Sequence, residues 1–328
     1  MSAALTSVWV ISDGRRGIEN QALGLAEALA RMTILNITRK LIGSDPSFAA
    51  LPPRLQLLRK PKPVKYGLAA PFPNIAIGCG RQAIAPLRVI KAHSPETFIV
   101  YVQDPRGSYN KFDLIIAPEH DGLERPNVIS MIGSPNRITE QKLQDAEQAF
   151  QHKLSSFSSP RAALLIGGPS KRQFIDSAHL DEHIETAQAL LKAGYSLLIT
   201  LSRRTDDTAR DAWTKFANAH SDQVWFYDEK TANTDPNPYF SFLAASDLIF
   251  VTEESTNMLT EAYGTTAPVY RLSMAGQAGK FQQLYESLEN YRNTPPLSEI
   301  LNTPKQSYEP LRETDRITAL VWTHYQQF

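Results

Sequence analysis

Residues Asp247–Ala262 read Asp-Leu-Ile-Phe-Val-Thr-Glu-Glu-Ser-Thr-Asn-Met-Leu-Thr-Glu-Ala, and this stretch decides the fold. Residues 248–251 are all apolar and predict a buried parallel strand, whereas the segment from Thr256 onward predicts an amphipathic helix. A helix that follows a parallel strand presents unpaired N–H groups and the positive end of its dipole to the carboxyl edge of the sheet. The stretch therefore predicts an α/β protein with an anion site at that edge.

Three side chains near the start of this predicted helix suit a nucleotide. Ser255 stands at the expected N-cap position. Met258 and Glu261 are three residues apart and share one side of the helix, and Glu261 leans back over the first turn. A carboxylate there fits a ribose diol. Glu261 could equally be only a solvated carboxylate on the surface of a helix, and both interpretations stay open.

Apolar strands alternate with helices along the chain. Strands are predicted at 8–11, 33–37, 75–77, 98–102 and 114–116, and then at 162–166, 196–200, 223–226, 248–251 and 267–270. Helices are predicted at 20–31, 139–154, 181–193, 206–220 and 256–263. This alternation is typical of doubly wound parallel sheets. Because the series restarts after the polar linker 152–160, we expect two Rossmann-like domains, residues 1–155 and 160–305, facing a central cleft.

Composition narrows the class of protein. The chain has 328 residues, of which 42% are hydrophobic and 21% charged, as in soluble globular proteins. No apolar run is long enough to span a membrane and no signal peptide is recognisable, so a cytoplasmic protein is expected. The single cysteine, Cys79, excludes an internal disulfide and disfavours structural zinc; we expect it to be a small buried residue.

Charge is distributed unevenly although the net charge is zero. Residues 1–159 contain 19 Lys and Arg against 13 Asp and Glu, whereas residues 160–328 contain 15 against 21. Between Pro46 and Pro95 there is no acid, but eight basic residues and several leucines. Segment 51–65 could therefore lie on an anionic membrane, unless acidic neighbours supplied by the fold neutralise it. Nucleic acid is not expected, because no recognition motif accompanies the charge.

Polar loops follow the predicted strands of both domains. In the first domain, Gly14 and Gly17 permit close backbone approach, Asn20 and Gln21 open a helix, and a second turn contains Gly80 and Arg81. In the second, one turn carries Gly167, Gly168, Ser170 and Lys171, another carries Ser202, Arg203 and Arg204, and a third carries Glu254. Each alone could be only a tight turn. Three at one sheet edge predict a phosphate-binding crevice.

Several common sites are disfavoured. None of the turns has the dinucleotide-binding pattern of three spaced glycines or a Walker A sequence. His179 and His183 lack the companions of a metal site, so no metal is expected. His120, in Glu-His-Asp after a predicted strand, could reach the cleft or only stabilise its own loop.

A set of motifs resembles a known family. They are Asp13–Ala26, Gly78–Arg81, Gln103–Arg106, Ala117–Asp121, Ile166–Lys171, Ser202–Thr205, Asn237–Tyr239 and Val251–Met258. Together they are similar to the bacterial ELM family, whose plant relative is a mitochondrial fission factor, over about residues 8–316. The second half also resembles the nucleotide-binding domain of GT-B glycosyltransferases, especially the enzyme that adds N-acetylglucosamine to the lipid-linked peptidoglycan precursor.

The resemblance implies a GT-B-like fold, with acceptor chemistry in the first domain, donor binding in the second and a terminal helix, within 306–328, packed back on the first. Glu261 falls on the acidic residue that holds the ribose of a UDP-sugar. One position departs: the family usually has histidine where this chain has Ile18. Asp13, Glu19 and Asp104 are the possible replacements as general base, although Asp13 could instead brace its glycine turn and Asp104 its Pro105 turn.

These observations predict a metal-independent glycosyltransferase without a cofactor. It would move sugar from a nucleotide-diphosphate donor, with UDP as the expected nucleotide, to an envelope or lipid-linked acceptor at the inner membrane surface. The alternative is a non-catalytic scaffold of the same fold that recruits a partner protein. The expected acceptor-site residues are Gly14, Gly17, Asn20, Gln21, Gly80, Arg81, Arg106 and His120. The expected donor-site residues are Gly167, Gly168, Ser170, Lys171, Ser202, Arg203, Arg204, Tyr239, Glu254, Ser255, Met258 and Glu261.

Overall fold

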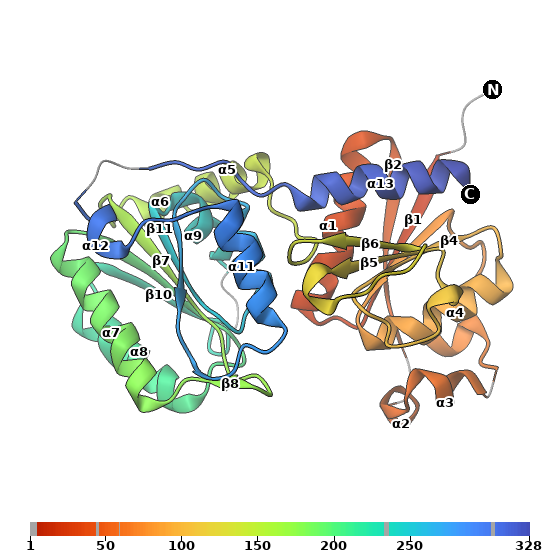
Figure 1. Cartoon of the computed structure of the whole chain (residues 1–328), viewed down its shortest axis with the longest axis horizontal. Helices are drawn as coiled ribbons and strands as arrows, with labels where there is room; N and C mark the ends of the chain where they lie inside the picture. The colour runs from red at the N-terminus through yellow and green to blue at the C-terminus, as the bar shows by residue number, and fades with distance from the viewer. Residues whose placement is uncertain (1–4, 44–45, 59, 233–235, 303–305) are drawn as a thin grey trace. The chain divides into compact units, whose positions relative to one another are not determined.

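The computed structural model describes residues 5–43, 46–58, 60–232, 236–302 and 306–328. The chain divides into two compact units (Figure 1). The first unit comprises residues 1–137 together with 312–328, and the second comprises residues 138–311. Two parallel α/β units confirm the architecture that the alternation of strands and helices predicts.

The first unit contains a six-stranded parallel sheet in the order β2-β1-β3-β4-β5-β6. The strands are β1 (Thr6–Ser12), β2 (Leu35–Leu41), β3 (Ile75–Cys79), β4 (Phe98–Val102), β5 (Leu114–Pro118) and β6 (Val128–Met131). Strand order reverses between β1 and β3, because β2 lies on one side of β1 and the later strands on the other. Such a switch point opens a crevice at the carboxyl ends of the two strands, where ligands bind in doubly wound folds.

Helices cover both faces of this sheet. On one face, α1 (Arg16–Met32) packs against α13 (Glu313–Gln327), and Ile317 and Val321 of α13 are fully buried in the core. On the other face lie α4 (Ile84–His93) and the smaller helices α2 (Pro46–Ala50) and α3 (Pro53–Leu58). Short 3-10 helices complete the loops: η1 (Pro63–Tyr66), η2 (Arg81–Ala83), η3 (Tyr109–Lys111) and η4 (Glu119–Asp121).

The second unit contains a five-stranded parallel sheet in the order β10-β9-β7-β11-β12. Its strands are β7 (Arg161–Ile166), β9 (Ser196–Leu201), β10 (Val224–Asp228), β11 (Leu248–Thr252) and β12 (Val269–Leu272). Its helices are α5 (Glu140–Ala149), α6 (Gln151–Leu154), α7 (Ser177–Lys192), α8 (Asp207–Ala219), α9 (Tyr239–Ala245), α10 (Thr256–Tyr263), α11 (Phe281–Tyr291) and α12 (Leu297–Ile300). A short antiparallel pair joins β8 (Gln173–Phe174) to β13 (Ala275–Gly276). Here strand order reverses between β7 and β11.

The boundary between the units differs from the predicted one. Residues 138–155, expected in the first domain, belong to the second unit, because α5 packs against α9 there. Residues 306–311 also belong to the second unit. The buried guanidinium of Arg292 donates to the carbonyl of Glu309, and the Leu311 amide donates to the carbonyl of Tyr263. Residues 152–160 therefore form the end of α6 and the loop that follows it, within the second unit.

Candidate functional site

The switch point of the second unit brings two predicted loops together. Gly167 and Gly168 follow β7, and Glu254 follows the neighbouring strand β11. The Gly167 amide donates to Thr252 Oγ1 at 2.8 Å, and the Gly168 amide donates to Glu254 Oε1 at 2.9 Å. A Cβ on Gly167 would overlap the Glu254 carboxylate, and one on Gly168 would overlap the backbone of Arg204. Only glycine fits at either position.

Glu254 is the most strongly perturbed acid at this edge. Its side chain is 0% exposed, and Oε2 has no hydrogen-bond partner among the described residues. Burial raises the pKa of Glu254 to about 7, although its bonds with Thr252 and the Gly168 amide, and the charge of Arg204, oppose the shift. The Arg204 guanidinium lies 3.6 Å from Oε1 and is itself largely exposed. Perturbed buried acids of this kind are concentrated at functional sites.

The two serines predicted in the loops after β7 and β9 mainly hold their own turns. Ser170 Oγ accepts from the amides of Arg172 at 3.1 Å and Gln173 at 3.0 Å, and Ser202 Oγ accepts from the Arg204 amide at 3.2 Å. The cations are more accessible. Lys171 is exposed, and Arg203 is more than half exposed, with its Nε 3.5 Å from a carboxylate oxygen of Glu229. The loops therefore bring cations, more than hydroxyls, within reach of an anion.

The remaining predicted donor residues lie on α10, at its N-cap and at the start of α9. Glu261 is only 7% exposed and accepts a hydrogen bond from the Tyr239 hydroxyl at 2.7 Å, so the interpretation as a solvated surface carboxylate is wrong. Burial, reinforced by the charge of Glu261, holds the pKa of Tyr239 well above its usual value. Met258 is half-buried on the same helix. Ser255 occupies the N-cap position, but its side chain makes no capping hydrogen bond, contrary to the prediction.

The switch point of the first unit is occupied differently. Asp13 binds the backbone and guanidinium of Arg15, so its carboxylate braces the turn in which Gly14 adopts a φ of +81°. Gly80, after β3, has a φ of +75° and faces Ile18, whose Cγ2 would lie 3.0 Å from a Cβ at that glycine. An apolar side chain thus covers Gly80 at the position where the family resemblance implies a histidine.

Helix α1 contributes several buried polar side chains below this turn. Glu19 is buried and forms an ion pair with Arg39 of β2. Gln21 accepts hydrogen bonds from Cys79 Sγ at 3.3 Å and from Gln103 Nε2 at 3.2 Å, and it donates to the carbonyl of Gly17 at 3.2 Å. Cys79 is buried as predicted, and burial raises its pKa. The Gln21 amide therefore links α1 to the ends of β3 and β4.

The other predicted acceptor residues do not form one cluster of contacts. Asp104 Oδ1 accepts from the Arg106 amide at 2.7 Å, so Asp104 braces its own turn, and Arg106 is exposed. His120 is buried within η4, with Nε2 3.9 Å from Asp121. Asn20 is half-buried on α1 and Arg81 is exposed on η2. Within the described ranges, no group of three or more His, Cys, Asp or Glu side chains is placed to hold a metal ion.

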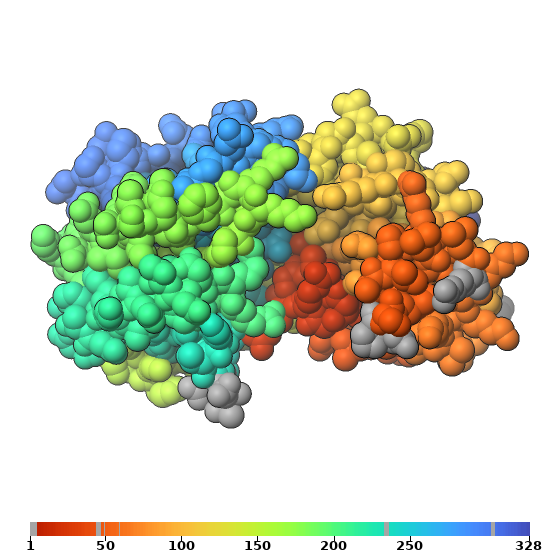
Figure 2. Space-filling model, turned by 90° about the horizontal axis from the view of Figure 1, so that it is seen from below, coloured from red at the N-terminus to blue at the C-terminus, as the bar shows by residue number. Residues whose placement is uncertain are grey.

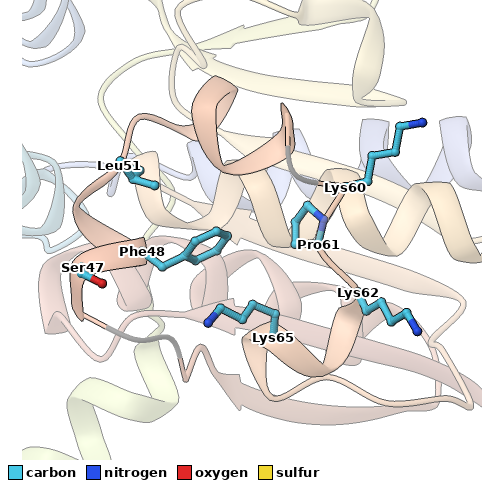
Figure 3. A pocket seen from close by; sticks show the side chains of 7 residues that line it. All are labelled: Ser47, Phe48, Leu51, Lys60, Pro61, Lys62 and Lys65. Atoms are coloured by element: carbon cyan, nitrogen blue, oxygen red, sulfur yellow. The ribbon is translucent and has the colours of Figure 1, made fainter.

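The first part of the acid-free segment contains α2, α3 and η1 and borders a pocket of about 600 Å³. The pocket is lined by Ser47, Phe48, Leu51, Lys60, Pro61, Lys62 and Lys65. Lys65 Nζ lies 5.1 Å from the Phe48 ring centroid, while Lys60 and Lys62 extend away from the pocket (Figure 3). This part of the chain, orange in Figure 2, forms an outer surface of the first unit. Leu58 and Val64 there are 75% and 74% exposed, whereas Arg59 lies outside the described residues.

Sequence reasoning assigned no role to two side chains that shape these sites. Thr252 accepts from the Gly167 amide, and Gln103 donates to Gln21. The signal for Thr252 was a hydroxyl at the end of an otherwise apolar strand. Gln103, which adopts a φ of +90°, begins one of the family motifs, but no pattern in the sequence predicts its hydrogen bond with Gln21. Among the described residues, no helix is both long and apolar enough to cross a bilayer.

Comparison with solved structures identifies the fold. The catalytic domain of starch synthase IV from Arabidopsis thaliana, bound to ADP and acarbose, aligns with a TM-score of 0.54 at 11% identity and covers 99% of each chain. UDP-GlcNAc 2-epimerase from Neisseria meningitidis, bound to UDP-GlcNAc, aligns with a TM-score of 0.52 at 11% identity and covers 99% of this chain and 100% of the epimerase. The chain therefore has the GT-B fold of glycosyltransferases and related epimerases.

Sequence comparison identifies relatives whose sequences are more similar to this chain than those of the two solved structures above. An uncharacterized protein of Rickettsia prowazekii is 24% identical and covers 96% of this chain and 97% of its own length. The mitochondrial fission protein ELM1 of Arabidopsis thaliana is 25% identical over 268 residues, which are 74% of this chain but only 61% of the plant protein. The family described as mitochondrial fission ELM1 matches residues 16–325. The chain belongs to the mitochondrial fission ELM1 family.

Proposed function

We propose that the second unit binds a nucleotide-diphosphate sugar and that the protein is a glycosyltransferase. The observation that carries this proposal is the pairing of Gly168 with Glu254 at the switch point, with Glu261 buried on the helix that follows. Main-chain amides and a helix start at one edge of a parallel sheet are suited to phosphates. The solved structures of the same fold that contain ADP or UDP-GlcNAc support this choice of ligand.

Each part of the donor has a proposed contact. Lys171, Arg203 and Arg204 would neutralise the diphosphate, since all three are exposed beside the loops. Glu261, oriented by Tyr239, would accept from the ribose hydroxyls. During transfer the departing diphosphate gains negative charge, so fixed cations beside it stabilise the transition state more than the ground state. This scheme requires no metal ion.

The acceptor proton would go to a carboxylate of the first unit. Glu19 is an unfavourable base, because it is buried and paired with Arg39. Asp13 and Asp104 are less enclosed and stand after β1 and β4, at the carboxyl edge of the sheet. Both brace local turns, so a base at either position would have to exchange a backbone contact for the acceptor.

We further propose that the acceptor is an envelope or lipid-linked glycan and that the first unit meets the inner membrane surface. The exposed Leu58 and Val64 and the lysines around the pocket support an anionic membrane as the partner. Among the described residues, no carboxylate forms an ion pair with Lys60, Lys62 or Lys65. Apolar side chains with neighbouring lysines are the combination that attaches amphipathic segments to anionic lipid.

A second candidate is a scaffold of the same fold that recruits a partner protein. Ile18 over Gly80 favours it, because this side chain cannot carry a proton. The plant relative, named as a mitochondrial fission protein, supports the same alternative.

Calorimetry with UDP and UDP-N-acetylglucosamine, followed by an assay for release of UDP, separates the two candidates. The proposal expects binding, and expects turnover when a membrane extract supplies acceptors. Binding without turnover, unchanged in Asp13→Asn and Asp104→Asn variants, would favour the scaffold. An absence of nucleotide binding would remove the proposed function.

A further inference from the structure

The Gly168 amide already donates to a carboxyl oxygen, and that oxygen belongs to a side chain of the protein. In loops that bind phosphate, main-chain amides after a strand donate to phosphate oxygens. Here the Gly168 amide donates to Glu254 Oε1 at 2.9 Å. The fit is tight, since no Cβ could be accommodated at Gly167 beside the same carboxylate. Glu254 therefore takes the position in which a ligand oxygen would be expected.

This carboxylate is incompletely satisfied. Its side chain is 0% exposed, and among the described residues Oε2 has no hydrogen-bond partner. Burying an ionised oxygen without a partner is unfavourable, whereas a protonated Oε2 loses the charge and becomes a donor. The neutral form of Glu254 is therefore more favoured in this geometry than the neutral form of a solvated glutamate is in water.

The charges around Glu254 act in opposite directions. Arg204, in the loop after β9, lies 3.6 Å from Oε1 and favours ionisation, but its guanidinium is largely exposed to solvent. Tyr285 of α11 is a further ionisable neighbour, and its hydroxyl donates to the carbonyl of Glu253. Burial outweighs Arg204 and raises the pKa of Glu254 to about 7. A second anion at this edge would disfavour ionisation further, because like charges a few ångströms apart repel each other.

We propose that a nucleoside diphosphate binds at the β7–β11 switch point together with a proton, which Glu254 takes up from solvent on Oε2. The protonated side chain no longer competes as an anion for the Gly168 amide, and its O–H is free to donate to a phosphate oxygen. This inference rests on the nucleotide-binding function proposed above and adds a coupling to pH. Donor binding is then strongest below neutrality and weakens as the pH rises.

The test is calorimetry of the full chain with UDP-N-acetylglucosamine. Each of its two phosphates carries an ester bond, so the ligand itself does not titrate near neutrality. Between pH 7 and pH 8.5 the affinity of the wild type should fall about 15-fold, the loss expected when only the protonated form binds. At pH 8 we expect close to one proton to be taken up per nucleotide bound. Titrations in Tris and in HEPES should therefore give binding enthalpies that differ by nearly the full difference between the ionisation enthalpies of the two buffers.

Glu254→Gln is the informative variant, because glutamine keeps an acceptor for the Gly168 amide and cannot titrate. It should bind with the same affinity from pH 7 to pH 8.5 and without proton uptake. Asp207→Asn, which removes an exposed carboxylate from α8 of the same unit, should behave as the wild type.

The outcomes separate this inference from the function on which it rests. Wild-type binding that is independent of both pH and buffer would overturn the proton coupling and leave nucleotide binding in place. The same pH dependence in Glu254→Gln as in the wild type would also overturn it. If neither protein binds at pH 6, the proposed function fails as well. The buffer comparison on the wild type stands even if the variant does not fold.

Discussion

Replacing Glu254 by glutamine should change how the stability of the second unit depends on pH, even without nucleotide. The pKa of this carboxyl is raised from 4.5 to about 7 by burial. The folded protein therefore holds the proton more tightly than the unfolded chain. Its contribution to stability is complete below about pH 4.5, declines as the pH rises, and is lost once the pH has passed about 7.

The size of the effect follows from the shift. One pKa unit corresponds to about 1.4 kcal/mol, so the full difference is about 3 kcal/mol, of which about 2 kcal/mol falls between pH 5.5 and pH 8. Since Glu254 is buried, solvent screening does not reduce this figure substantially. The free energy of unfolding of the wild type should drop by about 2 kcal/mol more than that of Glu254→Gln over this interval.

Urea unfolding followed by tryptophan fluorescence measures this difference. Trp213 and Trp225 belong to the second unit, so a background with Trp9 and Trp322 replaced by phenylalanine reports that unit alone. Other titrating groups contribute equally to both proteins and cancel in the comparison. Parallel pH profiles for wild type and Glu254→Gln, within about 0.5 kcal/mol, would refute the assignment of a raised pKa to Glu254.

Five further variants test the donor site, the membrane surface and the fold. Glu261→Ala should weaken UDP binding by about 1.5–3 kcal/mol in calorimetry, because it removes hydrogen bonds to a charged group, and unchanged affinity would remove Glu261 from the site. Lys171→Gln and Arg203→Gln should each weaken UDP far more than uridine, whereas equal losses for both ligands would indicate a folding defect. Combined replacement of Lys60, Lys62 and Lys65 by glutamine should reduce sedimentation with anionic vesicles, by about 1 kcal/mol of binding per lysine, while the same change at Lys192, Lys215 and Lys280 of the second unit should not. Ile317→Ala should destabilise the first unit by about 2–5 kcal/mol in thermal unfolding, since Ile317 is fully buried; a loss below 1 kcal/mol would contradict the packing of α13.

The sequence predicted the parallel strands well, because buried strands such as β4 are continuous apolar runs. It missed β6, whose residues are mostly half-exposed, and the pair β8–β13, whose two strands have only two residues each. The boundary was misplaced because a polar composition marks any exposed loop. Only tertiary contacts, here between α5 and α9, show to which core a helix belongs.

For the candidate sites, the sequence predicted which residues stand at the strand ends more easily than which partners their side chains contact. The glycines and acids at strand ends follow from the local pattern, and the structure shows Gly168 and Glu254 in contact. Whether a polar side chain faces a ligand or its own backbone depends on a single torsion angle. Ser170 and Asp104 illustrate this, since both bind amides two residues further along the chain. Glu261 accepts its hydrogen bond from Tyr239, which lies 22 positions earlier in the sequence.

The first unit is built from both ends of the chain, and this affects the order in which the protein can fold during synthesis. Its core requires Ile317 and Val321, which follow the entire second unit. At 5–20 residues per second a ribosome needs roughly 9 to 35 s to make residues 138–311, and throughout that time the surface of the first sheet that α13 covers lacks its helix. The second unit, which is continuous, can complete its core first. The nascent first unit is therefore the part of this protein expected to engage chaperones, and its folding is completed only after α13 leaves the ribosome.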